Sequence, residues 1–273
     1  MKLSDNPIGV FDSGVGGLSV LRAMRGLMPA ENMIYLGDQG HVPYGPRPME
    51  DIQKFSEGIT RFLLDQNSKL IVVACNTASA AALTYLRERF SDVSFVGMEP
   101  AVKPAAETTK TGKVGVLATP ATFQGALYAS VVERFAAGVE LFQHTCPGLV
   151  SQIERGELDS SATREILENA LCPMLEKNID TVVLGCTHYP FVIPLIEQIV
   201  GENVRVIDPA PSVARQAKRL LEATGNLNQT EKSVKVRFFT SGDSAAMKSL
   251  LPLLLGMNGE VKSVRWKEDQ VTQ

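Results

Sequence analysis

The chain has 273 residues, 44% of them hydrophobic and 21% charged, so it can bury a substantial core in one large domain or two ordinary ones. A net charge of −3 with scattered basic residues gives no electrostatic reason to expect nucleic acid or an anionic membrane as a partner. No segment approaches the ~18 apolar residues of a membrane span and the N-terminus lacks a signal-like apolar region, which predicts a cytoplasmic protein.

Short apolar segments alternate with segments of helical periodicity along nearly the whole chain. Strands are predicted at residues 8–12, 33–38, 70–75, 94–98, 114–119, 139–143, 181–186, 204–208 and 234–240. Helices are predicted at residues 18–28, 52–66, 78–89, 124–136, 162–178 and 213–223. This alternation is typical of parallel sheets covered by helices, so the predicted fold class is α/β.

The two halves of the sequence are similar to each other. GVFDSG at residues 9–14 matches GVLATP at 115–120, and LIVVAC at 70–75 matches TVVLGC at 181–186. We therefore expect two similar lobes, each a mainly parallel sheet flanked by helices, with an active site in the cleft between them. Residues 99–207 are predicted to form the second lobe, and residues 208–273 to return and complete a first lobe begun by residues 1–98.

Two cysteines, Cys75 and Cys186, each end a predicted strand and precede a predicted helix. A single cysteine in this position is usually a small buried hydrophobe. At a helix N-terminus, however, the helix dipole favours a thiolate. Two such thiols on opposite lobes suit the removal of a proton from one face of a carbon and its return on the other face.

Two other chemistries fit the sequence less well. The glycine loop at residues 9–20 has Gly14 and Gly16 of a dinucleotide fingerprint but Ser19 at the third position, and Asp12 would repel a pyrophosphate. The pairs His144 with Cys146 and Cys186 with His188 have one intervening residue each, whereas structural zinc pairs usually have two to four. We expect neither a nucleotide cofactor nor a metal.

Several motifs together give the chain a family resemblance. It resembles the glutamate racemases of the aspartate/glutamate racemase superfamily in PIGVFDSGVGGLSV (7–20), YLGD (35–38), PYGPR (43–47), ACNTASA (74–80), GVLAT (115–119), CPGLV (146–150), LGCTHYP (184–190) and FFTSGD (238–243). The resemblance extends over nearly the whole length. It implies a cofactor-independent, cytoplasmic racemase that interconverts L- and D-glutamate for peptidoglycan synthesis, and a homodimer.

The resemblance also implies roles for individual residues. Cys75 and Cys186 match the two proton-transferring bases, Asp12 a group near the substrate ammonium and Cys75, and His188 and Glu154 groups that assist Cys186. Asp38 matches a further acid near Cys75. The expected substrate contacts are Asp12, Ser13, Tyr44, Gly45, Asn76, Thr77, Thr187 and His188.

The sequence also departs from the family pattern. Where relatives usually read GDTARVPYG, this chain has GDQGHVPYG, so Gln39, Gly40 and His41 indicate a change in loop packing or in a subunit contact. The first strand begins almost at once, so activation by a cell-wall nucleotide precursor, associated with an N-terminal extension in some relatives, is not expected. Two alternatives stay open: an aspartate racemase of the same superfamily, and an amino-acid-binding protein without turnover.

Overall fold

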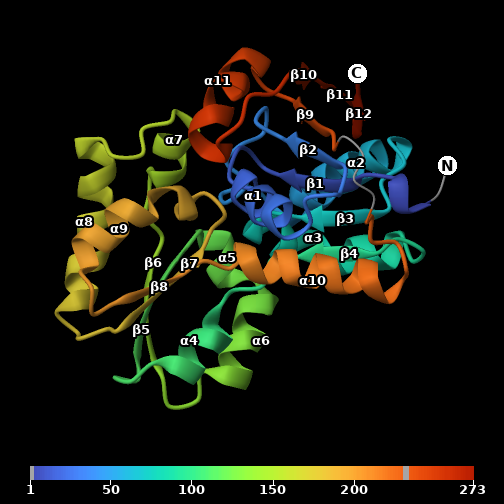
Figure 1. The fold of residues 1–273 in the computed structure, drawn as a ribbon. Coiled ribbons are helices and arrows are strands. Elements are labelled where there is room, and N and C mark those ends of the chain that lie inside the picture. Colours follow the sequence, from blue (N-terminus) through green and yellow to red (C-terminus); the bar gives the residue numbers. More distant parts are fainter. Residues whose placement is uncertain (1–2, 230–233) are drawn as a thin grey trace. The chain divides into compact units, whose positions relative to one another are not determined.

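The computed structural model describes residues 3–229 and 234–273. The chain divides into two compact units (Figure 1). Unit 1 comprises Met1–Met98 and Ala210–Gln273, and unit 2 comprises Glu99–Pro209. Both units are α/β, which confirms the predicted fold class.

Unit 1 is built on a parallel sheet. Its described residues give a six-stranded sheet of order β10-β9-β2-β1-β3-β4, whose strands are β1 (Ile8–Asp12), β2 (Met33–Gly37), β3 (Leu70–Val73), β4 (Phe95–Gly97), β9 (Val236–Thr240) and β10 (Val261–Ser263). Every residue of β1, β2 and β3 is buried, as expected for parallel strands covered on both faces. A short antiparallel hairpin follows, formed by β11 (Arg265–Lys267) and β12 (Gln270–Thr272).

The helices of unit 1 pack in two groups. The first group contains α1 (Leu18–Leu27), α10 (Ala210–Ala223) and α11 (Ser244–Leu255), and the second contains α2 (Met49–Asp65) and α3 (Asn76–Arg89) with β12 packed on α2. A 3-10 turn, η1 (Leu3–Asp5), precedes β1. The apolar side chains of α2 and α3 form one buried cluster with those of β1, β2 and β3. Phe239, Val264 and Val271 from the C-terminal segment belong to the same cluster, so both ends of the chain contribute to it.

Unit 2 repeats the same design on a smaller scale. Its strands are β5 (Lys113–Ala118), β6 (Glu140–His144), β7 (Thr181–Gly185) and β8 (Arg205–Ile207), all parallel, in the order β6-β5-β7-β8. Its helices are α4 (Val102–Thr108), α5 (Pro120–Gln124), α6 (Ala126–Phe135), α7 (Leu149–Glu154), α8 (Ser161–Leu175) and α9 (Ile193–Val200), with a 3-10 turn η2 (Tyr189–Val192) before α9. Helices α4 and α6 cover one buried cluster, and α8 packs against α7 and α9.

Strand order fixes where a ligand can bind on each sheet. In unit 1 the chain passes from β1 to β2 on one side and then crosses to β3 and β4 on the other, so the direction of the connections switches at the β1–β3 pair. Unit 2 switches in the same way at the β5–β7 pair. Open α/β sheets bind ligands at the carboxyl ends of the strands at such points. The two matching pairs of segments found in the sequence are these strands.

Some predicted elements differ from the structure. The helix expected over residues 124–136 corresponds to α6, which begins only at Ala126 because the chain is extended at Gly125. The helix expected to end at residue 178 ends at Leu175. The helix expected after Cys186 is α9, whereas helices α4, α5, α7 and α11, strand β10 and the terminal hairpin were not predicted. Each is short or, like α11, lacks a clear polar face, so periodicity alone does not reveal it.

A buried ion pair joins four segments of unit 1. The Lys69 ammonium lies 2.6 Å from a Glu31 carboxylate oxygen, and both side chains are fully buried. The ammonium also donates to the carbonyl oxygens of Ser4 (2.6 Å) and Asn226 (2.9 Å). The second Glu31 oxygen accepts from the Asn228 amide at 2.8 Å. Both charges are thus compensated in the interior, which is the condition for burying them.

A carboxylate at the start of β7 organises a turn in unit 2. Asp180 accepts hydrogen bonds from the Thr109 and Thr181 hydroxyls and from the Lys110 and Thr111 amides. Burial raises the pKa of Asp180, but these four donors outweigh it and lower the pKa to about 2.

We expect Asp180→Asn to destabilise the protein by about 1 kcal/mol at pH 7, because the turn loses a charged acceptor. The folded pKa lies below the ordinary value of 3.8, so the stabilisation is present above about pH 4 and is lost as the pH falls toward 2. Urea unfolding at several pH values checks this. A difference between the proteins that stays constant from pH 7 to pH 2.5 would contradict it.

In the described parts of the chain, no helix is long and apolar enough to cross a membrane.

Candidate active site

The first group of predicted residues lies where β1 ends in unit 1. Asp12, the last residue of β1, is fully buried and accepts a hydrogen bond from the Gly14 amide at 2.8 Å. Helix α1 begins close by, and a Cβ on Gly17 would lie 2.7 Å from the Asp12 Cβ. Glycine is therefore required there for the helix to approach the strand so closely. This packing accounts for the glycine at position 17.

Cys75 lies beside this loop, two residues beyond the end of β3. Its backbone is extended and it serves as the N-cap of α3, with Sγ accepting from the Ala78 amide at 3.4 Å. The Ser13 hydroxyl lies 3.8 Å from the same sulfur. The thiol is 4% exposed. Because β1 and β3 are neighbours, Asp12, Ser13 and Cys75 meet at the switch point of the unit 1 sheet.

The first turn of α3 adds two further predicted residues, Asn76 and Thr77, each 4% exposed. Cys75 takes the N-cap position of α3, and Asn76 is its first helical residue. Neither the oxygen nor the nitrogen of the buried Asn76 amide has a hydrogen-bond partner. An unpaired buried amide is costly, so a ligand that pairs with it gains affinity.

The loop after β2 carries Tyr44 and Gly45. Tyr44 is 1% exposed and donates its hydroxyl proton to Asp38 at 2.6 Å. Burial and the neighbouring charges of Asp38, Cys75 and Asp12 raise the pKa of Tyr44 well above its usual value. Tyr44 therefore lies near the Cys75 and Asp12 side chains as a neutral phenol.

In unit 2 the predicted residues form a hydrogen-bonded chain. Cys186 follows β7 directly, and its sulfur lies 3.8 Å from Nδ1 of His188. Nε2 of His188 lies 2.6 Å from a Glu154 carboxylate oxygen at the end of α7. Burial lowers the pKa of His188, but the hydrogen bonds and charges of Cys186 and Glu154 raise it well above 6.5. His188 is thus a buried imidazolium between a thiol and a carboxylate. Thr187 is buried next to it.

Cys186 differs from the prediction in one respect. The sequence suggested a helix N-terminus at both thiols, but Cys186 precedes the 3-10 turn η2, and α9 starts only at Ile193. Pro190 in this turn and Pro194 in the first turn of α9 have no amide N–H to donate, which favours a 3-10 turn followed by a separate helix over one continuous helix. His188, and not a helix dipole, is the positive group closest to this sulfur.

A third buried thiol, Cys146, was not among the predicted site residues. It has a positive φ of 46° and its amide donates to Nδ1 of His144 at 3.0 Å. Burial and the neighbouring Cys186 raise the pKa of Cys146 to about 12. It stays protonated at neutral pH and cannot act as a base. Its proximity to Cys186 depends on the conformation of the CPGLV loop, which the periodicity of the sequence does not predict.

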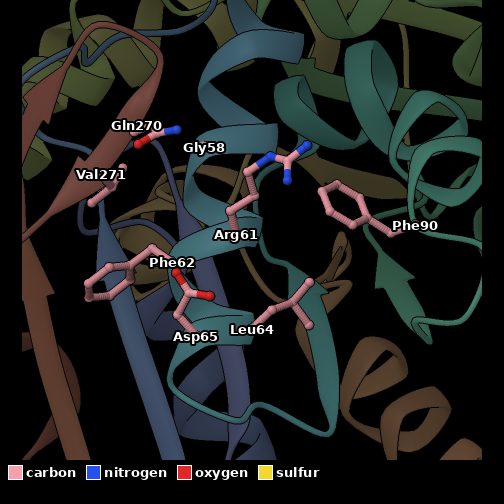
Figure 2. Close-up of a pocket in the computed structure, with 8 residues that line it drawn as sticks. All are labelled: Gly58, Arg61, Phe62, Leu64, Asp65, Phe90, Gln270 and Val271. Atoms are coloured by element: carbon pink, nitrogen blue, oxygen red, sulfur yellow. The ribbon is translucent and has the colours of Figure 1, made fainter.

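Other possible sites in the described residues are less well equipped. No group of three or more His, Cys, Asp or Glu side chains is arranged to hold a metal in those ranges. A hollow of about 290 Å³ on unit 1, shown in Figure 2, is lined by Gly58, Arg61, Phe62, Leu64, Asp65, Phe90, Gln270 and Val271. None of the predicted site residues lines it.

We expect Glu154→Gln to lower kcat/KM about tenfold or more at neutral pH. The amide keeps a hydrogen-bond acceptor but removes the charge that raises the pKa of His188, so the imidazole loses its proton at a lower pH. The loss should grow as the pH rises. Glu157→Gln, an exposed neighbour, is the control. Identical pH–rate profiles for wild type and Glu154→Gln would contradict the role of Glu154.

A buried thiol therefore lies at the switch point of each parallel sheet, Cys75 beside a hydroxyl in unit 1 and Cys186 beside an imidazolium in unit 2. The arrangement is that of a two-unit α/β enzyme, in which thiols at these positions are candidate acid–base groups.

Comparison with known proteins identifies the family. The Asp/Glu/hydantoin racemase family matches residues 8–217. The chain is 49% identical over 261 residues to the glutamate racemase of Ectopseudomonas mendocina. The matched region covers 96% of this chain and 99% of that protein. Solved glutamate racemases from Francisella tularensis, in complex with D-glutamate, and from Escherichia coli, in complex with L-glutamate and the activator UDP-MurNAc-ala, are 32% and 33% identical, each with a TM-score of 0.82. They cover 95% and 94% of this chain, and each match spans 97% of the solved chain.

The chain therefore belongs to the Asp/Glu/hydantoin racemase family. It is an isomerase of the racemase type, which confirms the family and the class of activity expected from its motifs.

Proposed function

We propose that the chain interconverts L-glutamate and D-glutamate without a cofactor, and that Cys75 and Cys186 are the two acid–base groups. The observation that carries the proposal is the thiol at the switch point of each sheet. The names of the relatives support glutamate as substrate, since the Francisella tularensis and Escherichia coli proteins were solved with its two enantiomers.

The groups around Cys75 suit an amino acid. The buried Asp12 carboxylate favours an ammonium group, while the Ser13 hydroxyl and the unpaired Asn76 amide offer hydrogen bonds to carboxylate oxygens. Thr77 and the loop of Tyr44 and Gly45 complete the proposed contacts in unit 1, and Thr187 and His188 those in unit 2.

The chemical step moves one proton at each face of the α-carbon. One thiolate takes the α-proton, the bonding electrons remain on the carbon as a carbanion delocalised into the carboxylate, and the second thiol donates its proton to the opposite face. The carbanion is high in energy, so preorganised donors to the α-carboxylate must stabilise it. His188, held by Glu154, is placed to return a proton to Cys186 or to hydrogen-bond its sulfur.

Racemisation in D2O tests the proposal. With dialysed protein and either enantiomer, circular dichroism should decay to zero, and deuterium should enter mainly the product, because each face has its own thiol. Substantial exchange into recovered substrate would indicate a single base instead. Faster turnover of aspartate would assign the aspartate racemase alternative, and stoichiometric glutamate binding without loss of rotation would indicate a binding protein.

We also propose the setting in which the reaction is used. D-glutamate made in the cytoplasm would supply peptidoglycan synthesis, and the enzyme would act as a homodimer. Depletion of the protein should then be rescued by added D-glutamate, and light scattering should give twice the chain mass of 29.6 kDa.

A further inference from the structure

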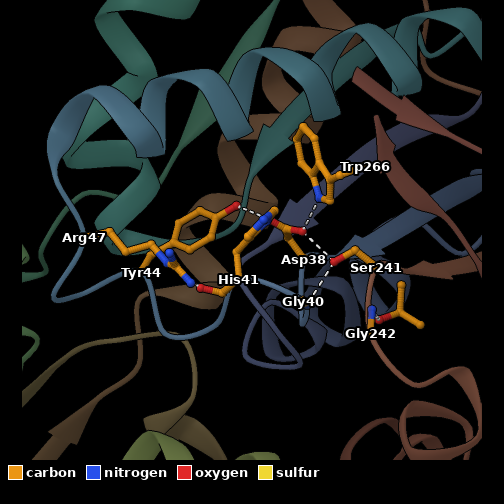
Figure 3. A network of polar contacts seen from close by, with 9 residues as sticks. Asp38, Gly40, His41, Tyr44, Arg47, Ser241, Gly242 and Trp266 are labelled. Carbon is orange, nitrogen blue, oxygen red and sulfur yellow. Dashed lines mark hydrogen bonds and ion pairs between the residues drawn. The ribbon is translucent and has the colours of Figure 1, made fainter. Parts of the chain in front are cut away.

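Asp38 of unit 1 is surrounded by hydrogen-bond donors. Figure 3 shows its carboxylate at the centre of a cluster formed by His41, Tyr44, Ser241 and Trp266. One oxygen, Oδ2, accepts from the Tyr44 hydroxyl at 2.6 Å and lies 2.9 Å from His41 Nδ1. The other, Oδ1, accepts from the Ser241 hydroxyl at 2.5 Å and from the Trp266 indole at 2.8 Å.

These four donors occupy the carboxylate completely. A carboxylate accepts about four hydrogen bonds, two at each oxygen. Asp38 is fully buried, so water does not compete for these positions. Burial raises the pKa of Asp38, but the hydrogen bonds from His41, Ser241 and Tyr44 and the charge of His41 outweigh it and lower the pKa. No acceptor position remains for a substrate or a thiol, and the carboxylate stays ionised.

The donors come from distant parts of the sequence. His41 and Tyr44 belong to the loop after β2, Ser241 follows β9 and Trp266 lies in β11. Trp266 is seated on α2 at Gly58, where a Cβ would lie 2.6 Å from the indole ring and from the Asp269 carbonyl oxygen. The terminal hairpin is thereby held against α2 and presents the indole to Asp38.

The residues that depart from the family pattern contact the same cluster. Gln39 accepts from the Thr240 hydroxyl at 2.9 Å, and the Gly40 amide donates to the Ser241 hydroxyl at 3.0 Å. The His41 ring stacks on Phe55 at 4.0 Å and meets the Trp266 ring edge-on at 5.3 Å. Gln39, Gly40 and His41 thus connect the loop after β2 to the C-terminal part of unit 1.

We propose that Asp38 is a positioning residue and not a proton carrier: together with Ser241 and Trp266 it fixes the loop that presents Tyr44 and Gly45 to the substrate. The inference rests on the proposed function, because it takes Tyr44 and Gly45 as substrate contacts. It assigns a role in substrate binding to the hairpin of β11 and β12.

Steady-state kinetics separate the two roles. Trp266→Phe keeps the aromatic ring but removes the N–H donor, and Ser241→Ala removes a hydroxyl. Each should raise the KM for both enantiomers about three- to tenfold and change kcat less than about twofold. Lys267→Ala, an exposed position in the same strand as Trp266, should leave both constants unchanged. An unchanged KM in Trp266→Phe and Ser241→Ala overturns the proposal.

A double variant tests whether Trp266 acts through Tyr44. If it does, the KM of Tyr44→Phe/Trp266→Phe should stay within about twofold of that of Tyr44→Phe alone. If the KM of the double variant instead rises by the product of the two single-variant factors, the two residues act independently, which overturns the proposal. Asp38→Asn should raise KM in both directions without moving the acid limb of the kcat/KM profile. A shifted limb, or a loss of kcat confined to one direction, would identify a proton carrier.

Fluorescence gives a readout that does not depend on turnover. Trp266 is the single tryptophan of the chain, so its emission reports on the cluster directly. Asp38→Asn and Tyr44→Phe should change this emission without substrate, whereas Lys267→Ala should not. An emission unchanged in both variants overturns the proposed coupling. Coupled emission in a wild type that does not racemise glutamate would defeat the proposed function while leaving the Asp38 cluster intact.

Discussion

Replacement of either Cys75 or Cys186 by alanine is expected to lower glutamate racemisation by at least about 10³-fold while leaving the fold intact. A positioned acid or base contributes about 10²- to 10⁴-fold, and in a two-base reaction neither group can substitute for the other, because each serves one face of the α-carbon. Both thiols are buried small side chains at strand ends, so alanine removes the sulfur with little change in packing.

Polarimetry with each enantiomer measures this effect, and thermal unfolding verifies the fold. Cys172→Ala is the matched control, since Cys172 is an exposed thiol on α8. Cys146→Ala provides a second comparison: burial and Cys186 raise the pKa of Cys146 to about 12, which disfavours the thiolate, so this variant should retain far more activity than Cys186→Ala. Full turnover in either the Cys75 or the Cys186 variant would show that one base is sufficient.

Lys69→Met is expected to destabilise the protein by about 3–5 kcal/mol, the usual cost of breaking a buried ion pair from one side. The substitution leaves the Glu31 carboxylate buried without its counter-charge and the carbonyls of Ser4 and Asn226 without their donor. Lys69 lies at the opposite end of β3 from Cys75 and outside the proposed contacts, so the loss should appear in stability and not in kcat.

Urea unfolding measures this loss, and the double variant Glu31→Gln/Lys69→Met supplies its control. It removes both charges but keeps an acceptor for the Asn228 amide, so it should be more stable than Lys69→Met alone. If the double variant is less stable than Lys69→Met, the charge left on Glu31 is not the cause of the destabilisation in Lys69→Met.

Much of the fold follows from local sequence. The central strands are continuous apolar segments, and the matching halves indicate which of them carry the thiols. The α/β class was predicted on that basis, whereas the racemase family was predicted from the resemblance of the motifs. Cys75, Asp12 and Ser13 meet because β1 and β3 are adjacent, which the order of apolar segments makes plausible but does not determine.

Other features of the site depend on contacts between distant segments. The family resemblance pointed to an acid at Asp38 near Cys75, but only the structure reveals the four donors that fill its carboxylate, two of them from residues about 200 or more positions away in the sequence. Helix α7, which carries Glu154 toward His188, spans only Leu149–Glu154 and gives too few residues for a periodic pattern. Such pairings are set by tertiary packing.

The division of the chain also bears on how the protein forms during synthesis. Unit 2 is one continuous stretch, whereas the sheet of unit 1 needs β9, which pairs with β2 across some 200 residues of intervening chain. Because domains fold as they emerge from the ribosome, unit 2 can close early while unit 1 waits for the last residues. A nascent chain halted before β9 should therefore hold a folded unit 2 beside an unfinished unit 1 that proteases cleave readily.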